Sequence, residues 1–141
     1  MNFNILIDCG HGGIDDKGNY TTAPNKMHTF PDGDVIHEGV INRQIGKKVY
    51  EDLEAKGYCP SYVLFPEESI DMPLRERVEI INSFDPKKTI GISFHSNASH
   101  FHNVRGFEIF TSVGETESDL LATCIGEEII EEFPTNRFRK D

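Results

Sequence analysis

Residues 3–13, FNILIDCGHGG, combine an apolar run with a glycine-rich turn. Phe3, Ile5 and Ile7 alternate within a mostly apolar run, which is the pattern of a β-strand. The run stops at Asp8, and three of the next five residues are glycine, which indicates a tight loop directly after the strand. The sequence therefore predicts a first strand that delivers Asp8 and His11 to its carboxyl end.

The rest of the chain alternates short apolar runs with helical patterns. The runs predict strands at residues 62–65, 89–95 and 107–111. Apolar residues at helical spacing predict helices at residues 40–56, at residues 118–133, and between a cap at Asp71 and a stop signal at Asp85 and Pro86. The side chains expected to face inward are Ile41, Ile45, Val49 and Leu53, then Leu74, Val78 and Ile81, then Leu121, Ile125 and Ile129.

Alternation of strands and helices predicts an α/β fold with a mainly parallel, mixed central sheet and helices on both of its faces. We expect one domain over residues 1–141, because this length suits a single core. In such sheets ligands bind outside the carboxyl ends of the strands. His11 and His95 both follow predicted strands, so they are expected to share one crevice.

A polar segment at residues 14–37 has no hydrophobic period and is too long for an ordinary connection. Its glycines and prolines indicate a loop. We expect residues 21–33 to be exposed and mobile at the tip, with the ends of the segment flanking the crevice.

Composition excludes several classes of function. Lysine and arginine number 14 against 24 aspartates and glutamates, a net charge of −10 that disfavours nucleic acid and anionic membranes as partners. No apolar stretch approaches the roughly 20 residues of a membrane helix. Three widely separated cysteines without a CxxC pair indicate neither a disulfide framework nor a thiolate zinc site.

His11, Glu38 and His95 are the candidate metal ligands. Catalytic zinc is typically held by three histidine or carboxylate ligands with one position left for water. Each residue also has a structural interpretation: a turn histidine, an ordinary first-turn acid and a core histidine respectively. Weaker alternatives are His37 as a ligand in place of Glu38, His28 in the loop, and a rim position for His100 and His102.

Two acidic residues near these positions have other predicted roles. Asp8 is expected to brace His11 or the backbone rather than bind metal. Glu108 is a candidate general base, although an ion pair with Arg105 or Arg77 is the more ordinary interpretation.

Taken together, the sequence resembles the zinc-dependent N-acetylmuramoyl-L-alanine amidases, the peptidoglycan-cleaving enzymes of autolysins and phage endolysins. Five blocks in the family's order carry the resemblance: ILIDCGHGG (5–13), HEGVINRQIGKKVYEDLEAKGY (37–58), MPLRERVEIIN (72–82), GISFHSNA (91–98) and RGFEIFTS (105–112). The resemblance implies an amidase-like fold and zinc bound by His11, Glu38 and His95. Asn97, in the fourth block, is expected to bind substrate.

This resemblance implies cleavage of the amide between N-acetylmuramic acid and L-alanine, with peptidoglycan as the partner. Two alternatives stay open: a catalytically impaired binding or structural module of a phage or cell-wall assembly, and a related metallopeptidase. No signal-peptide pattern begins the chain, so we expect synthesis in the cytoplasm and action at the wall after release by phage or prophage lysis.

Three features depart from the family pattern. Cys9 replaces a small residue and is expected to be structural. The segment between His11 and Glu38 is longer than the family's common form. The family's catalytic glutamate lies on a final strand after a segment like Asn136-Arg137, so we expect a domain without that strand, an unassigned general base, and a wall-binding domain beyond Asp141 as a possible addition.

Overall fold

The computed structural model describes residues 3–22, 24–58, 62–64, 70–99, 101 and 103–139. Its contacts divide the chain into two compact units, Met1–Asn97 and Ala98–Asp141, which are described separately. Cys59, Phe65, His100 and His102 lie outside the described residues.

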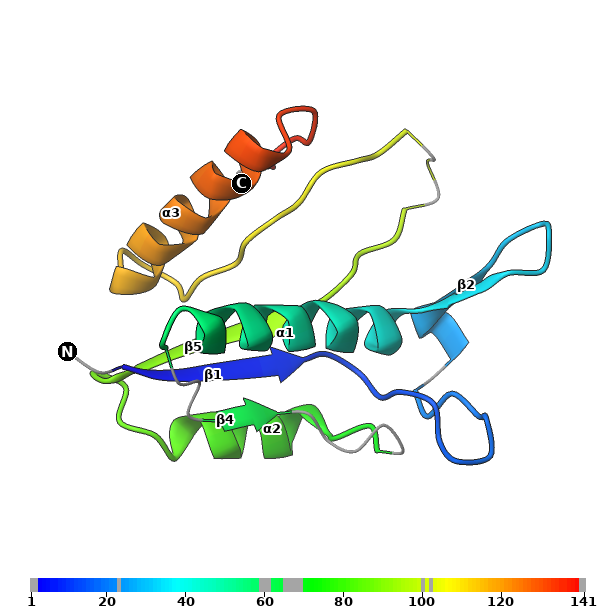
Figure 1. Cartoon of the computed structure of the whole chain (residues 1–141), viewed down its shortest axis with the longest axis horizontal. Coiled ribbons are helices and arrows are strands. Elements are labelled where there is room, and N and C mark those ends of the chain that lie inside the picture. The colour runs from blue at the N-terminus through cyan, green and yellow to red at the C-terminus, as the bar shows by residue number, and fades with distance from the viewer. Residues whose placement is uncertain are drawn as a thin grey trace. The chain divides into compact units, whose positions relative to one another are not determined.

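A three-stranded parallel sheet forms the centre of the first unit (Figure 1). Its strands are β1 (Asn4–Cys9), β4 (Tyr62–Leu64) and β5 (Thr89–Phe94), in the order β4-β1-β5. Both neighbours of β1 run parallel to it, and its register with β5 runs from Asn4 opposite Thr89 to Cys9 opposite Phe94. The predicted α/β class and the parallel pairing are confirmed for this unit. The central strand is its most buried element, with Leu6 and Ile7 almost without exposure.

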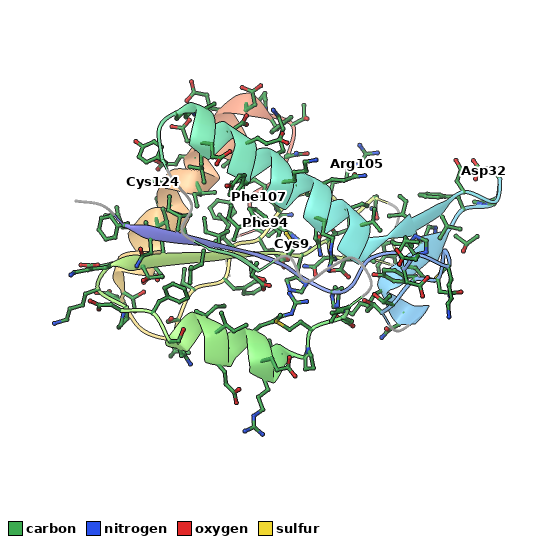
Figure 2. The ribbon with its side chains drawn as sticks, turned by 60° about the horizontal axis from the view of Figure 1, so that its bottom comes forward. Cys9, Asp32, Phe94, Arg105, Phe107 and Cys124 are labelled. Carbon is green, nitrogen blue, oxygen red and sulfur yellow. The ribbon has the colours of Figure 1, made fainter. Side chains whose placement is uncertain are left out.

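Helices α1 (Glu38–Ala55) and α2 (Leu74–Asn82) cover opposite faces of this sheet, as both views show (Figures 1 and 2). Helix α1 begins two residues earlier than predicted, which places Glu38 in its first turn. Helix α2 begins after Pro73 and has no side-chain cap, so the predicted cap at Asp71 is wrong.

The expected apolar stripes of these helices do not match their buried faces. In α2, Leu74 is 76% exposed and Val78 44%, whereas the buried residue of that helix is Arg77. In α1 the buried positions are Gly39, Asn42, Arg43 and Gly46. Both helices bury polar side chains against backbone carbonyls near the end of β1, and these contacts determine which face of each helix is buried.

The segment that was expected to be an irregular loop contains a β-hairpin. A short 3-10 helix, η1 (Pro24–Lys26), leads into β2 (Met27–Thr29), which pairs antiparallel with β3 (Val35–His37). The turn closes through a hydrogen bond from the Phe30 N–H to the Asp34 carbonyl oxygen and another from the Gly33 N–H to the Phe30 carbonyl oxygen, and Asp32 lies at the tip (Figure 2). Residues 27–36 are all exposed, so the predicted exposure is confirmed for residues 27–33, whereas Thr21, Thr22 and Lys26 are partly buried. The regular structure was not foreseen.

The second unit contains helix α3 (Glu117–Glu132), which starts at a capping box between Thr116 and Asp119. The predicted strand at 107–111 is wrong: only Phe107 makes a β-bridge, to Phe138, in the described part of this unit. The two rings stack with centroids 4.8 Å apart, and the Phe138 ring lies against Gly126 of α3. Ring stacking and packing against α3 thus hold this segment, where an extended β-ladder was predicted. The inward face of α3 is as predicted, with Leu121, Ile125 and Ile129 each partly buried.

Across the described residues, no helix has the length and apolar character needed to span a membrane.

Candidate metal centre

Three side chains from distant parts of the sequence meet beside the carboxyl ends of β1 and β5. His11 follows β1, His95 follows β5 directly, and Glu38 opens α1. Glu38 Oε1 lies 3.3 Å from His11 Nε2 and 3.2 Å from His95 Nδ1. One ligand atom from each residue lies within 4.8 Å of the other two. The structure thus brings together the three residues that the sequence proposed as ligands.

His11 adopts a left-handed backbone conformation, with φ of 68°. This conformation is uncommon for a residue with a Cβ atom and costs about 1–2 kcal/mol. Its carbonyl oxygen accepts hydrogen bonds from Arg43 Nη1 at 2.9 Å and from Arg77 Nη2 at 3.3 Å. Two cationic side chains therefore hold the strained turn that presents this candidate ligand.

Arg43 and Asn42 join the first turns of α1 to the loop after β1. Besides His11, Arg43 Nη1 donates to the carbonyl oxygens of Gly12 at 2.7 Å and Gly39 at 2.9 Å. Asn42 donates to the carbonyl of Gly10 and accepts from the Ser96 hydroxyl, which connects it to the segment of His95. Sequence reasoning missed both residues, although polar residues one turn after Glu38 were a usable signal.

Arg77 makes a buried ion pair with Asp8 on the opposite face of the sheet. The guanidinium also donates to the carbonyl of Cys9, and the second Asp8 oxygen accepts from the Ser93 hydroxyl at 2.6 Å. Asp8 therefore braces His11 through Arg77, which is an indirect form of the predicted role. A buried charge pair of this kind depends on such additional hydrogen bonds.

Two glycines allow the ligand elements to approach closely. The His95 ring lies directly on Gly10, where an added Cβ would overlap the ring, and a Cβ on Gly39 would overlap the carbonyl oxygen of Gly12. These glycines therefore make room for the site's own side chain and backbone.

Electrostatics favour an ionised Glu38 and a neutral His11. Burial raises the pKa of Glu38, but the hydrogen bond from the Ser96 N–H and the two histidines outweigh it, so the net pKa lies below its ordinary value. Burial is the main reason that the pKa of His11 is lowered, with Glu38 opposing the shift. A carboxylate and a neutral imidazole are the protonation states that a metal ligand needs.

The donor set fits a zinc ion. His11 Nε2 is buried, faces Glu38 Oε1 and has no hydrogen-bond partner among the described residues. An unpartnered nitrogen of this kind is costly unless something else takes its lone pair. Two imidazoles and one carboxylate are a common ligand set of catalytic zinc, which leaves a fourth position open.

The other sequence candidates make contacts outside the ligand set. The His37 ring packs on Tyr20 with centroids 4.4 Å apart, and His28 packs on Phe30 in the exposed hairpin. Glu108 belongs to the second unit and pairs with Arg139 at 2.6 Å. Cys9 is buried with a free thiol, and burial raises its pKa to about 12, as expected for a structural cysteine.

A family model described as N-acetylmuramoyl-L-alanine amidase matches residues 5–140 of the chain. No match was found among curated proteins or among solved structures.

Proposed function

Because the chain belongs to the N-acetylmuramoyl-L-alanine amidase family, we propose that it is a zinc hydrolase that cleaves the amide between N-acetylmuramic acid and L-alanine of peptidoglycan. The observation that carries the zinc assignment is the convergence of His11, Glu38 and His95 within 4.8 Å. This substrate places the activity at the bacterial cell wall.

The three ligands divide the work of holding the ion. Glu38 supplies the negative charge and is kept ionised by the Ser96 N–H and by its position at the N-terminus of α1. His11 presents a neutral nitrogen from a backbone that is fixed before the metal arrives. When bound, zinc supplies Lewis acidity, which polarises a carbonyl oxygen and lowers the pKa of a water.

Asn97 is the proposed substrate-binding residue. It is exposed and follows His95 by two positions, beyond the end of β5. An amide side chain there can donate to a carbonyl oxygen and accept from an N–H group, so it suits an N-acylated substrate.

The test is product analysis combined with metal analysis. We expect the zinc-loaded chain to contain about one zinc ion and to release new L-alanine amino termini from purified peptidoglycan. His95→Ala is expected to lose both properties. His28→Ala is the matched control, because it removes an exposed histidine outside the ligand set.

Three results would contradict the proposal. A different residue at the new amino termini would indicate a peptidase. Equal zinc content and equal release in the wild type and His95→Ala would remove His95 from the site, and absence of any release would support a binding module.

A further inference from the structure

Tyr20 belongs to the inserted segment, but its side chain reaches the first turn of α1. The Tyr20 hydroxyl accepts a hydrogen bond from the Gly39 N–H at 3.1 Å and donates one to the carbonyl oxygen of Lys26 at 3.2 Å. Its ring packs on His37, with ring centroids 4.4 Å apart. In the sequence His37 precedes Glu38 and Gly39 follows it. One side chain therefore contacts both chain neighbours of a candidate metal ligand.

This hydroxyl serves as the cap of α1. The N-terminal N–H groups of a helix have no partner within the helix, and the N-cap side chain ordinarily accepts from the second or third of them. In the described part of the chain, the N-cap residue His37 makes no such side-chain bond. Gly39 is the second residue of the helix and is buried, so its N–H needs a partner from the protein. Tyr20 supplies that partner from 19 positions away.

The backbone of Tyr20 is fixed to the loop that presents His11. Tyr20 forms an antiparallel bridge with Ile14. The next residue, Thr21, donates its N–H to the Gly13 carbonyl oxygen at 2.9 Å, and its hydroxyl accepts from the Gly13 N–H at 3.1 Å. Tyr20 therefore connects the loop after β1 with the first turn of α1, and each of these two segments carries one candidate ligand.

The position of that turn matters because Glu38 uses a single oxygen for several contacts. Glu38 Oε1 lies 3.3 Å from His11 Nε2 and 3.2 Å from His95 Nδ1, and it accepts the Ser96 N–H at 3.0 Å. A functional side chain has to be held within about 0.5 Å of its working position. A small rotation of the first turn of α1 would therefore separate Glu38 from both histidines.

We propose that Tyr20 is a positioning residue of the metal centre, which holds Glu38 in place by capping the first turn of α1. This inference rests on the zinc ligands of the proposed function, but not on its substrate. The hydroxyl acts through the helix backbone and is not itself a ligand. The inserted segment thereby becomes part of the metal centre, because zinc affinity depends on one of its side chains.

The zinc affinity of the full chain tests this proposal. Tyr20→Phe removes one oxygen atom and keeps the ring that packs on His37. We expect the affinity, measured by competition with a chelating dye, to fall about tenfold, as it does when a group that orients a metal ligand is lost. The matched control is Tyr50→Phe, which removes a hydroxyl that bonds to Glu54 in an exposed part of the same helix and should keep the wild-type affinity. Wild-type affinity in Tyr20→Phe would overturn the proposal.

A second control separates positioning from a general loss of stability. Ile7→Val removes one methyl group from the buried strand β1 and should lower the stability of the zinc-free protein in urea without changing zinc affinity. An equal fall in affinity in Ile7→Val and Tyr20→Phe would overturn the positioning role.

Cobalt-loaded protein gives a spectroscopic readout, since the visible absorption of Co²⁺ depends on the identity and geometry of its ligands. The bands should shift in Tyr20→Phe and match the wild type in Ile7→Val and Tyr50→Phe. Unchanged bands in Tyr20→Phe would contradict the displacement of Glu38.

Product analysis of peptidoglycan remains a separate measurement. A chain whose zinc affinity depends on Tyr20 but that releases no L-alanine termini would keep this inference and lose the proposed activity. A chain that binds zinc and releases those termini equally well with Tyr20→Phe would keep the proposed function and lose this inference. A wild-type chain that binds no zinc would lose both.

Discussion

His11 and His95 are the same type of side chain in one site, but the chain holds them by different means. The His11 side chain is 18% exposed, and its backbone is strained and hydrogen-bonded to two arginines. The His95 side chain is 50% exposed, rests on Gly10 and contacts Glu38 at 3.2 Å. Its neighbour Ser96 bonds to Asn42 and to Glu38.

This difference separates a rigid half of the site from an adaptable half. The buried arginines fix the position of His11 through the fold itself, so removing them costs stability. The position of His95 depends on a few contacts near the surface, so changes there should alter metal binding and leave the fold intact. The following four experiments test that division.

Arg77→Met should have the largest effect. It leaves the Asp8 carboxylate buried without its partner, and breaking such a pair costs about 3–5 kcal/mol of the free energy of unfolding. Urea denaturation of the zinc-free protein measures the loss. Arg75→Met on the exposed side of α2 is the control and should change stability by less than about 1 kcal/mol. Similar losses in both variants would mean that the rigid half is not built around Arg77.

Removal of either histidine should have the next largest effect. His11→Ala and His95→Ala each delete one proposed ligand, and we expect zinc affinity to fall on the order of 100-fold in both. Competition with a chelating dye measures the affinity. The stability of zinc-free His95→Ala should remain close to that of the wild type because the side chain is half-exposed. If that variant unfolds readily without metal, the adaptable half contributes to the fold after all.

Gly10→Ala should disturb the adaptable half by a smaller amount. The added Cβ overlaps the His95 ring, so the ring must move away from Glu38. We expect zinc affinity to fall about tenfold, as for other changes that misorient a ligand. Gly91→Ala in β5 is the matched control, since its Cβ would meet a neighbouring atom at an ordinary 4.0 Å. Equal zinc affinity in the two variants would show that zinc binding does not depend on the contact of the His95 ring with Gly10.

Lowering the pH should reduce the stability of the zinc-free fold, and this is the smallest effect that we expect among the four experiments. The pKa values of His11 and Glu38 are both lowered in the folded state, so the unfolded chain binds more protons and stability falls as pH falls. The contribution of His11 is complete above its ordinary pKa of 6.5 and is lost as pH falls through its lower folded value. Urea denaturation between pH 7 and 5 should show a shallower decline for His11→Asn than for the wild type. Identical pH profiles would mean that His11 is not held neutral by burial.

Local sequence patterns predicted those features of the fold that depend on residues close together in the sequence. The alternation before Asp8 specified β1, the four-residue repeat specified α1, and the positions of His11 and His95 after strands placed both at one edge of the sheet. Antiparallel pairing in the inserted segment was missed because Met27 and Val35 are exposed and lack the apolar alternation that marks a half-buried strand.

The faces of the helices could not be predicted because they depend on backbone carbonyls that are distant in sequence. Asn42 and Arg43 are buried because they donate hydrogen bonds to backbone carbonyl oxygens in the turn after β1. A hydrophobic repeat in the sequence does not indicate where such carbonyl groups lie. The same argument applies to Arg77 in α2, where a charged residue displaces the expected face of Leu74 and Val78. Within the site, the convergence of the ligands was predictable, whereas the residues that orient them required the fold.

The Tyr20 hydroxyl donates to the carbonyl oxygen of Lys26 and accepts from the N–H of Gly39, so the base of the hairpin is held whatever the length of its tip. Tyr20 closes the inserted segment at its base, β3 passes directly into α1, and the tip at Asp32 and Gly33 is exposed. Residues added at that tip lengthen the hairpin while the bonds that orient Glu38 stay the same. The tip is therefore a natural point for evolutionary insertion, and a place where an affinity tag or a second binding peptide can be grafted without rebuilding the metal ligands.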